Sequence, residues 1–315
     1  MSAIPSQAQT GSAPTSGTVW AARNSGTTAY LDSIFGTSDG KHLWVVGGSG
    51  TILESDDRGA SWTARSSGTS EFLQSIFGTN DGQHLWVVGD SGTILESDDG
   101  GTRWTARKSG TTNNLVSVFG TSDGRRLWAV GTEGTIVESA DGGATWTARK
   151  SGTTNTLFSI FGTRDGKRVW AVGLRTFLES DDGGATWTAR YRGTDGPFSS
   201  IFGTSDGKRL WIADGSGAIL DRHFTPLPLS DDGVATWAWH NTSSGPLNSI
   251  FSADDGQRLW AVGRYGTILL SDDGGVSWTK QSSGTSNALN SIFGTSDGRR
   301  LWVVGGNGTI LESDR

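Results

Sequence analysis

The eight residues SIFGTSDG at positions 33 to 40 recur along the chain, and their spacing decides the fold. Successive copies begin 42, 42, 42, 41, 49 and 42 residues apart. This period is typical of a four-stranded propeller blade and is too long for a leucine-rich or ankyrin repeat. The copies therefore predict an all-β, seven-bladed propeller. With some substitutions, they begin at Ser33, Ser75, Ser117, Ser159, Ser200, Ser249 and Ser291.

Each copy divides at glycine-containing turns into four short runs, here named strands a to d. In the second copy these runs are Leu73 to Gly78, His84 to Gly89, Thr93 to Ser97 and Arg103 to Arg107. Strand b is apolar without alternation, which predicts a strand covered on both faces. Blades that stack face to face around an axis provide that cover, and their strands are expected to pair antiparallel.

The two ends of the sequence predict how the ring closes. The last copy stops after its strand c, whereas residues 16–23, SGTVWAAR, match a strand d. The N-terminal segment is therefore expected to complete the seventh blade, which leaves no open sheet edge. We interpret residues 1–14 as a flexible leader and 15–315 as a single domain, with blades beginning near residues 31, 73, 115, 157, 198, 247 and 289.

Composition narrows the classes of partner. The formal net charge of -6 and the pI near 5.2 argue against a nucleic-acid or anionic-membrane surface. With no cysteine there is no disulfide framework and no thiolate site. No apolar run approaches a membrane span, and the N-terminus lacks the features of a signal peptide. The compartment stays undetermined, with an extracytoplasmic location open if the terminus is trimmed, and a monomer is favoured.

A second repeated motif follows each strand c and has the pattern Ser/Thr-x-Asp-x-Gly-x-x-Trp, here named the box turn. The serine and aspartate oxygens are expected to accept hydrogen bonds from the N–H groups of the turn itself, and glycine to take a positive φ. The tryptophan then holds the hairpin against the blade. The residues given this structural role are Ser55, Asp57, Gly59, Trp62, Ser97, Asp99, Gly101, Trp104, Ser139, Asp141, Gly143, Trp146, Ser180, Asp182, Gly184, Trp187, Ser271, Asp273, Gly275 and Trp278.

The box turn resembles the Asp-box of bacterial-neuraminidase-type repeats. The full unit LWVVGDSGTILESDDGGTRWTARKSGTT, residues 85–112, is similar to the repeats of the photosystem II stability and assembly factor family. The similarity covers nearly all of residues 16–315. It implies a seven-bladed propeller with the box between strands c and d. It also implies a scaffold that binds a protein partner during assembly, in a family associated with an arginine-rich patch.

Calcium binding is the alternative interpretation of the acidic turn. An EF-hand loop needs a glutamate at its twelfth position, but counting from Asp99 the twelfth residue is Gly110. Two boxes are also damaged, because Val234 replaces the expected glycine and Arg315 the expected aspartate. A scaffold tolerates such losses better than a catalyst does. The structural interpretation is therefore preferred, and no metal or cofactor is expected.

A glutamate precedes the box serine in most copies, and an arginine follows the box tryptophan by three residues. Where the glutamate is lost the arginine is lost too: blade six has Leu270 with Gln281, and blade five has His240 at the arginine position. Joint loss favours cross-strand ion pairs over a ring of anion-binding cations. The predicted pairs are Glu54 with Arg65, Glu96 with Arg107, Glu138 with Arg149, Glu179 with Arg190, and Glu312 with Arg23.

Residues that break the repeat are the candidates for function. The b–c and d–a loops are expected on one rim and the box turns on the other. Small polar residues fill most of these loops, and blade five gains seven residues, 222–228, on its c–d side. Enrichment in arginine and aromatic residues is typical of interface hot spots and of sugar-stacking sites. The candidate binding rim comprises Arg175, Tyr191, Arg192, Asp195, Trp239, Arg264 and Tyr265.

No catalytic pattern accompanies these residues. The Arg-Ile-Pro motif of a sialidase is absent, and His42 and His84, on equivalent turns of separate blades, are interpreted as solvated rather than as metal ligands. We expect a non-enzyme. Two binding hypotheses remain: a scaffold that recognises a protein partner through the rim, and a multivalent lectin with glycan sites between blades.

Overall fold

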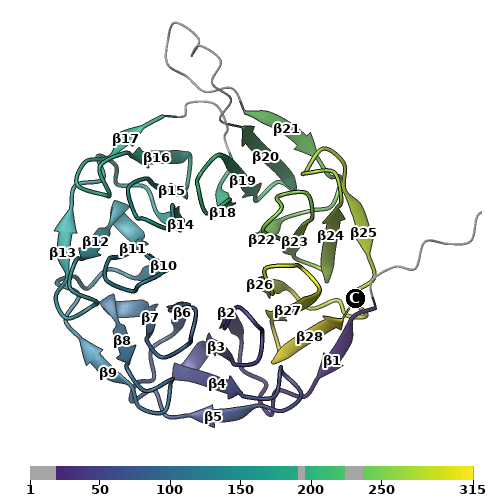
Figure 1. Ribbon diagram of the computed structural model, residues 1–315, viewed down its shortest axis with the longest axis horizontal. Helices are drawn as coiled ribbons and strands as arrows, with labels where there is room; N and C mark the ends of the chain where they lie inside the picture. The colour runs from purple at the N-terminus through teal and green to yellow at the C-terminus, as the bar shows by residue number, and fades with distance from the viewer. Residues whose placement is uncertain (1–18, 191–195, 224–236, 315) are drawn as a thin grey trace, which may run out of the picture.

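Seven four-stranded antiparallel sheets stand in a ring around a central opening in the computed structural model of the chain (Figure 1). The structure describes residues 19–190, 196–223 and 237–314. Each sheet follows the chain from its innermost to its outermost strand, except that the last one takes its outer strand from the N-terminal end. The predicted seven-bladed propeller is confirmed.

The strands agree with the sequence pattern to within two residues in the second copy. Blade one contains β2 (Leu31–Gly36), β3 (Leu43–Gly47), β4 (Thr51–Ser55) and β5 (Thr63–Arg65), and blade two β6 (Leu73–Gly78), β7 (Leu85–Gly89), β8 (Ile94–Ser97) and β9 (Thr105–Arg107). Blade three contains β10 (Leu115–Gly120), β11 (Leu127–Gly131), β12 (Ile136–Ser139) and β13 (Thr147–Arg149), and blade four β14 (Leu157–Gly162), β15 (Val169–Gly173), β16 (Thr176–Ser180) and β17 (Thr188–Ala189). Blade five contains β18 (Phe198–Gly203), β19 (Arg209–Asp214), β20 (Ala218–His223) and β21 (Ala238–Asn241), and blade six β22 (Leu247–Ser252), β23 (Leu259–Gly263), β24 (Thr267–Ser271) and β25 (Thr279–Gln281). Blade seven contains β26 (Leu289–Gly294), β27 (Arg300–Gly305), β28 (Thr309–Asp314) and β1 (Ala21–Arg23), and single 3-10 turns occur at η1 (Gly48–Gly50), η2 (Asp90–Gly92) and η3 (Thr132–Gly134).

The core lies between neighbouring blades. Strand b is buried at every position in blades one and two, as its unbroken apolar sequence predicts. One cluster joins Trp44 and Ile52 of blade one to Leu73 and Leu85 of blade two, and similar clusters occur at other junctions. Each blade therefore buries its apolar faces only by having neighbours on both sides.

The N-terminal strand closes the ring. β1 pairs antiparallel with β28, with Ala21 opposite Glu312, Ala22 opposite Leu311 and Arg23 opposite Ile310. Trp20 is buried in a cluster that also contains Leu311 of β28. The sequence predicted a strand over residues 16–23; within it the strand begins at Ala21, and residues 16–18, like the leader at 1–14, lie outside the described residues.

The innermost strands line a central channel and are tied to one another by serine. The Oγ of Ser33 accepts a hydrogen bond from the backbone N–H of Ile76 at 3.3 Å, which joins blade one to blade two. The equivalent bond is present at six of the seven described junctions. These bonds give a partner to backbone donors at the inner edge of each sheet, where no further strand follows. In the part of the chain described here, no helix is long and apolar enough to cross a membrane.

Candidate functional site

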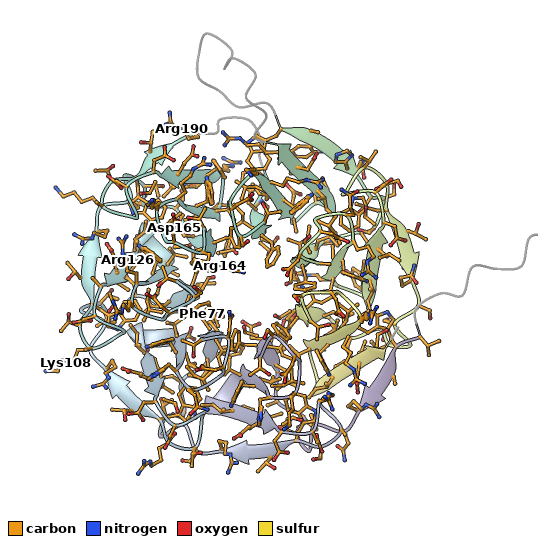
Figure 2. The ribbon with its side chains drawn as sticks, viewed as in Figure 1. Phe77, Lys108, Arg126, Arg164, Asp165 and Arg190 are labelled. Atoms are coloured by element: carbon orange, nitrogen blue, oxygen red, sulfur yellow. The ribbon has the colours of Figure 1, made fainter. Side chains whose placement is uncertain are left out.

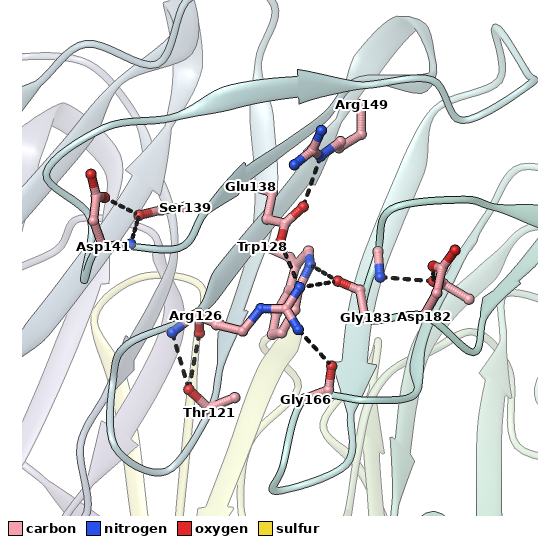
Figure 3. Close-up of polar contacts among 12 residues, drawn as sticks. Thr121, Arg126, Trp128, Glu138, Ser139, Asp141, Arg149, Gly166, Asp182 and Gly183 are labelled. Carbon is pink, nitrogen blue, oxygen red and sulfur yellow. Dashed lines mark hydrogen bonds and ion pairs between the residues drawn. The ribbon is translucent and has the colours of Figure 1, made fainter.

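The box turns use their polar groups internally. In blade three, Ser139 Oγ donates to Asp141 Oδ1 at 2.8 Å and accepts from the backbone N–H of Gly143 at 2.8 Å (Figure 3). The Thr145 hydroxyl donates to Asp141 Oδ2 at 2.6 Å, and its backbone N–H donates to Oδ1 at 2.9 Å. The Thr145 hydroxyl is the largest of the hydrogen-bonding effects that lower the pKa of Asp141 to about 2. The same serine and aspartate bonds recur at Asp57, Asp99, Asp182 and Asp273.

Each described box turn also contacts the preceding blade. Trp128 Nε1 of blade three donates to the carbonyl of Gly183 in the box of blade four at 3.2 Å (Figure 3). Trp44 makes the same bond to Gly100 of the next blade at 3.2 Å. A Cβ on Gly101 would lie 2.5 Å from Trp44 Nε1, so only glycine allows this approach. The turn is therefore a joint between blades, and box residues 230–236 of blade five lie outside the described residues.

The glutamates before the box and the arginines after it are in contact. The Nε of Arg107 lies 2.6 Å from Glu96 Oε2, with the arginine side chain 38% exposed and the glutamate 13%. They are diagonal neighbours across the strand pair, because Ile94 lies opposite Arg107 and Glu96 opposite Thr105. The other distances are 2.7 Å for Arg23 and Glu312, 2.6 Å for Arg65 and Glu54, 2.8 Å for Arg149 and Glu138, and 3.4 Å for Arg190 and Glu179.

Blade five retains a version of this pair that the sequence did not suggest. His240 Nε2 lies 2.9 Å from Asp221 Oδ1, and His240 lies opposite Ile219, as Arg107 lies opposite Ile94. The shorter aspartate and histidine thus replace glutamate and arginine together. The inserted residues that follow β20 had obscured this alignment.

The candidate rim divides into residues that share a face and residues that do not. Arg264 and Tyr265 form the b–c turn of blade six, and Arg175 is exposed on the b–c turn of blade four. Trp239 is 46% exposed, but it lies in β21, the outermost strand of blade five, opposite Leu220 of β20. It is therefore away from the face that carries the b–c turns (Figure 1). Three predicted members, Tyr191, Arg192 and Asp195, lie outside the described residues.

Two of these residues hold an unfavourable backbone conformation. Tyr265 has φ +58 and Arg175 has φ +51, in the left-handed region that costs a non-glycine residue about 1–2 kcal/mol. Other blades place Ser49, Ser91 and Asn307 at the same point of the turn. The Tyr265 side chain is 75% exposed and so gains little from burial in return.

Arg264 lines one opening of the central channel, here named the serine opening because the repeated serines of the inner strands surround it. The cavity measures about 380 Å³. Its wall is uneven, since the position before each serine carries a polar side chain in five blades and an apolar one in two. These residues are Asn248, Asn290, Asp32, Gln74 and Ser199 on the polar side, and Val116 and Phe158 on the apolar side.

Asp32 is the most perturbed acid at the serine opening. Burial, together with the nearby charge of Asp90, raises the pKa of Asp32 to about 7. Tyr30 stands beside it and donates its hydroxyl to Asn290 Oδ1 at 2.9 Å. Burial is also the main cause that raises the pKa of Tyr30.

The opposite opening is aromatic. Seven phenylalanines, one from each inner strand, follow one another around the channel with ring centroids 5.3 to 6.4 Å apart. Five of them, Phe35, Phe77, Phe119, Phe161 and Phe202, line a cavity of about 360 Å³, and Figure 2 shows Phe77 and Arg164 beside the central opening. The repeated turn residue here is small and polar except at Arg164 and Asp254. Among the described residues, no group of three or more histidines, aspartates and glutamates is arranged to hold a metal ion.

Comparison with known proteins identifies relatives by structure only. No family profile matches the chain, and no curated protein matches it. YCF48 from Cyanidioschyzon merolae superposes with a TM-score of 0.75 at 22% identity, covering 94% of this chain and 98% of that chain. A structure titled YCF48 bound to D1 peptide superposes with a TM-score of 0.75 at 21% identity, covering 94% of this chain and 95% of that chain. The chain therefore shares its fold with YCF48, and the resemblance drawn from the repeats is matched at the level of the fold.

Proposed function

We propose that this chain is a non-enzymatic scaffold that binds a segment of a protein partner at the serine opening. Arg264 and Tyr265 form the contact side of the site, and the uneven wall of the opening orients the segment. The observation that carries the proposal is Tyr265, which is 75% exposed and held at φ +58 beside an arginine that lines a cavity. Exposed tyrosine and arginine at the edge of a pocket are the residue types enriched at binding hot spots.

The wall of the serine opening suits a polypeptide. Asn248 and Asn290 donate their Nδ2 groups to the carbonyls of Leu289 and Leu31, so their side-chain oxygens supply the remaining capacity to accept from a peptide N–H. Val116 and Phe158 provide an apolar side for a hydrophobic side chain. Arg264 adds a fixed positive charge for an acidic residue or a chain terminus. YCF48, which shares this fold, has been solved in a structure titled as bound to D1 peptide.

The lectin alternative receives less support. A multivalent lectin needs equivalent aromatic platforms at equivalent places in several blades. The exposed aromatic side chains among the described residues are Tyr30, Trp239 and Tyr265, which occupy three different positions of the repeat. The tryptophans that do repeat on strand b are buried, and those that donate a hydrogen bond to the box turn of another blade are Trp44, Trp86, Trp128, Trp211 and Trp302.

A displayed library of random twelve-residue peptides tests the proposal. Peptides selected on the wild-type protein are expected to lose at least tenfold in affinity for the double variant R264A/Y265A. The melting temperature of this variant is expected to stay close to that of the wild type, because Tyr265 is 75% exposed and alanine meets the same left-handed backbone cost as tyrosine. The matched control is N307A, because Asn307 occupies the same point of the turn in blade seven with φ +55. Selected peptides that bind the double variant as well as they bind the wild type would exclude this site. Glycan-array binding that is equal for the wild type and the double variant would favour the lectin.

A further inference from the structure

Blade three contains a guanidinium group bound between blades. Arg126 Nη2 lies 2.7 Å from Glu138 Oε1 and donates to the carbonyl of Gly183 at 2.5 Å, and Nη1 donates to the carbonyl of Gly166 at 3.4 Å (Figure 3). Its Cζ stands 5.0 Å from the centre of the Trp128 ring. The guanidinium therefore fits a set of three oxygen acceptors beside an indole face.

Other blades repeat this arrangement. Arg209 of blade five donates to the carbonyls of Gly256 at 2.6 Å and Gly274 at 2.8 Å, with Cζ 4.7 Å from the Trp211 ring. Two copies from different blades show that the acceptors belong to the repeat itself. The position that supplies the guanidinium is the residue two before the tryptophan of strand b.

Blade two lacks this guanidinium, because the position is His84. The imidazole ring lies 6.2 Å from the Trp86 ring, and among the described residues it forms no hydrogen bond with Glu96, Gly124 or Gly142. Glu96 uses Oε2 for Arg107 at 2.6 Å, which leaves Oε1 without a described partner.

The equivalent acceptors at the junction of blades two and three line a cavity. It measures about 490 Å³, and Trp86, Glu96, Gly124 and Gly142 form part of its wall. The carbonyl of Gly142 accepts from Trp86 Nε1 at 3.1 Å, whereas its equivalent in blade three, that of Gly183, accepts from both Trp128 and Arg126. The carbonyl of Gly142 therefore retains capacity for a second donor.

The charge around this cavity favours a cation. Asp123, Asp141 and Arg125 also line it, so with Glu96 the lining has three carboxylates and one guanidinium, that of the exposed Arg125. The box residue Ala140 is smaller than the aspartate at the same position in blades one, two, four and six. Glu96 has one arginine partner, whereas Glu138 has two. A planar group with several donors meets two carbonyls and a carboxylate better than an ammonium does.

We propose that the cavity between blades two and three binds the guanidinium group of an arginine supplied from outside the chain. The expected polar contacts are those that Arg126 makes one blade further on, with Glu96 Oε1 and the carbonyls of Gly124 and Gly142, beside the stacked rings of His84 and Trp86 that also line the cavity. This site lies on the side of the box turns, and it is independent of the serine opening. The junction between blades one and two carries a related set, with His42 beside Trp44 and with Asp98 in place of Ala140.

Calorimetric titration with Nα-acetyl-arginine methylamide tests the site. Affinity is expected to fall at least tenfold in H84R, because the new side chain fills the acceptors as Arg126 does, and binding is expected to vanish in H42R/H84R. Both variants should melt at or above the wild-type temperature, so loss of binding will not reflect unfolding. R126H provides the reverse test. It removes the chain's own guanidinium from the acceptors of Arg126, so one more molecule of the arginine compound is expected to bind.

Two further ligands complete the design. Nα-acetyl-lysine methylamide should bind at least tenfold more weakly than the arginine compound. Free L-arginine identifies the source: equal affinity for both arginine compounds indicates a side chain of a protein, and a strong preference for the free amino acid indicates a metabolite. Equal binding of the arginine compound by the wild type and by H42R/H84R, or no binding to either, would overturn the proposal.

Discussion

Replacing Gly101 with alanine should weaken the joint between blades one and two. The box glycine has φ +90, and a Cβ there would lie 2.5 Å from Nε1 and 3.0 Å from Cδ1 of Trp44. Trp44 is 2% exposed and packed on several sides, so it has no free space into which to move. If the new Cβ displaces the indole, the hydrogen bond from Trp44 Nε1 to the carbonyl of Gly100, at 3.2 Å, is the interaction expected to weaken most.

The cost follows from three separate effects. A left-handed φ costs an alanine about 1–2 kcal/mol. Overpacking a buried side chain costs about 1–3 kcal/mol, and leaving an indole N–H without an acceptor costs a similar amount. We therefore expect G101A to lower the free energy of unfolding by about 3–8 kcal/mol.

The neighbouring glycine provides the matched control. Gly100 belongs to the same turn and has φ +70, but its Cβ would meet nothing nearer than the Gly82 carbonyl at 3.7 Å. G100A should therefore lose only about 1–2 kcal/mol. Urea denaturation followed by tryptophan fluorescence measures both variants. If G101A were no less stable than G100A, the box turn would not be the joint described here.

Three further predictions concern stability. Deleting residues 16–23 removes β1 and buried Trp20, so the melting temperature of the whole ring should fall, and an unchanged temperature would count against closure by this segment. The double charge reversal E96R/R107E should be more stable than either single reversal, because it restores the ion pair at 2.6 Å; a double variant no better than the singles would refute the pair. D32N should stabilise the protein by about 1–3 kcal/mol at about pH 8 and have little effect at about pH 4. The raised pKa of Asp32, about 7, means that the folded state loses stability as the pH rises from about 4 towards 7, and an equal effect of D32N at both pH values would contradict this.

The fold was predictable because the sequence of one blade recurs in seven similar copies, so each turn and strand can be recognised several times. Glycine and aspartate mark the turns, so the strands of the second copy were placed to within two residues of those observed. The N-terminal strand was found because residues 16–23 match the strand that the last copy lacks. Contacts between strands c and d could also be predicted. The glutamate before the box and the arginine after it are lost from the same blades, which suggests that their side chains are in contact.

Contacts between blades were harder to predict. The bond from Trp44 to Gly100 joins residues 56 positions apart, and no local pattern specifies that distance. His42 and His84 were interpreted as solvated turn residues, yet each ring stacks at 6.2 Å on the tryptophan of its strand b. Their significance depends on Arg126, whose acceptors become visible only when neighbouring blades are seen together. The uneven wall of the serine opening likewise combines single residues from several blades.

The repeated joints between blades and the proposed binding residues, which break the repeat, are expected to have separable roles. Peptide affinity measured on R264A/Y265A and on the box variant S97A, with melting temperatures taken on the same samples, tests this separation most directly. Ser97 Oγ accepts the backbone N–H of Gly101 at 2.8 Å, so S97A should lower the melting temperature and leave affinity unchanged, while R264A/Y265A should lose affinity and keep its melting temperature. The opposite pattern, with affinity lost in the box variant and retained in the rim variant, would contradict the account.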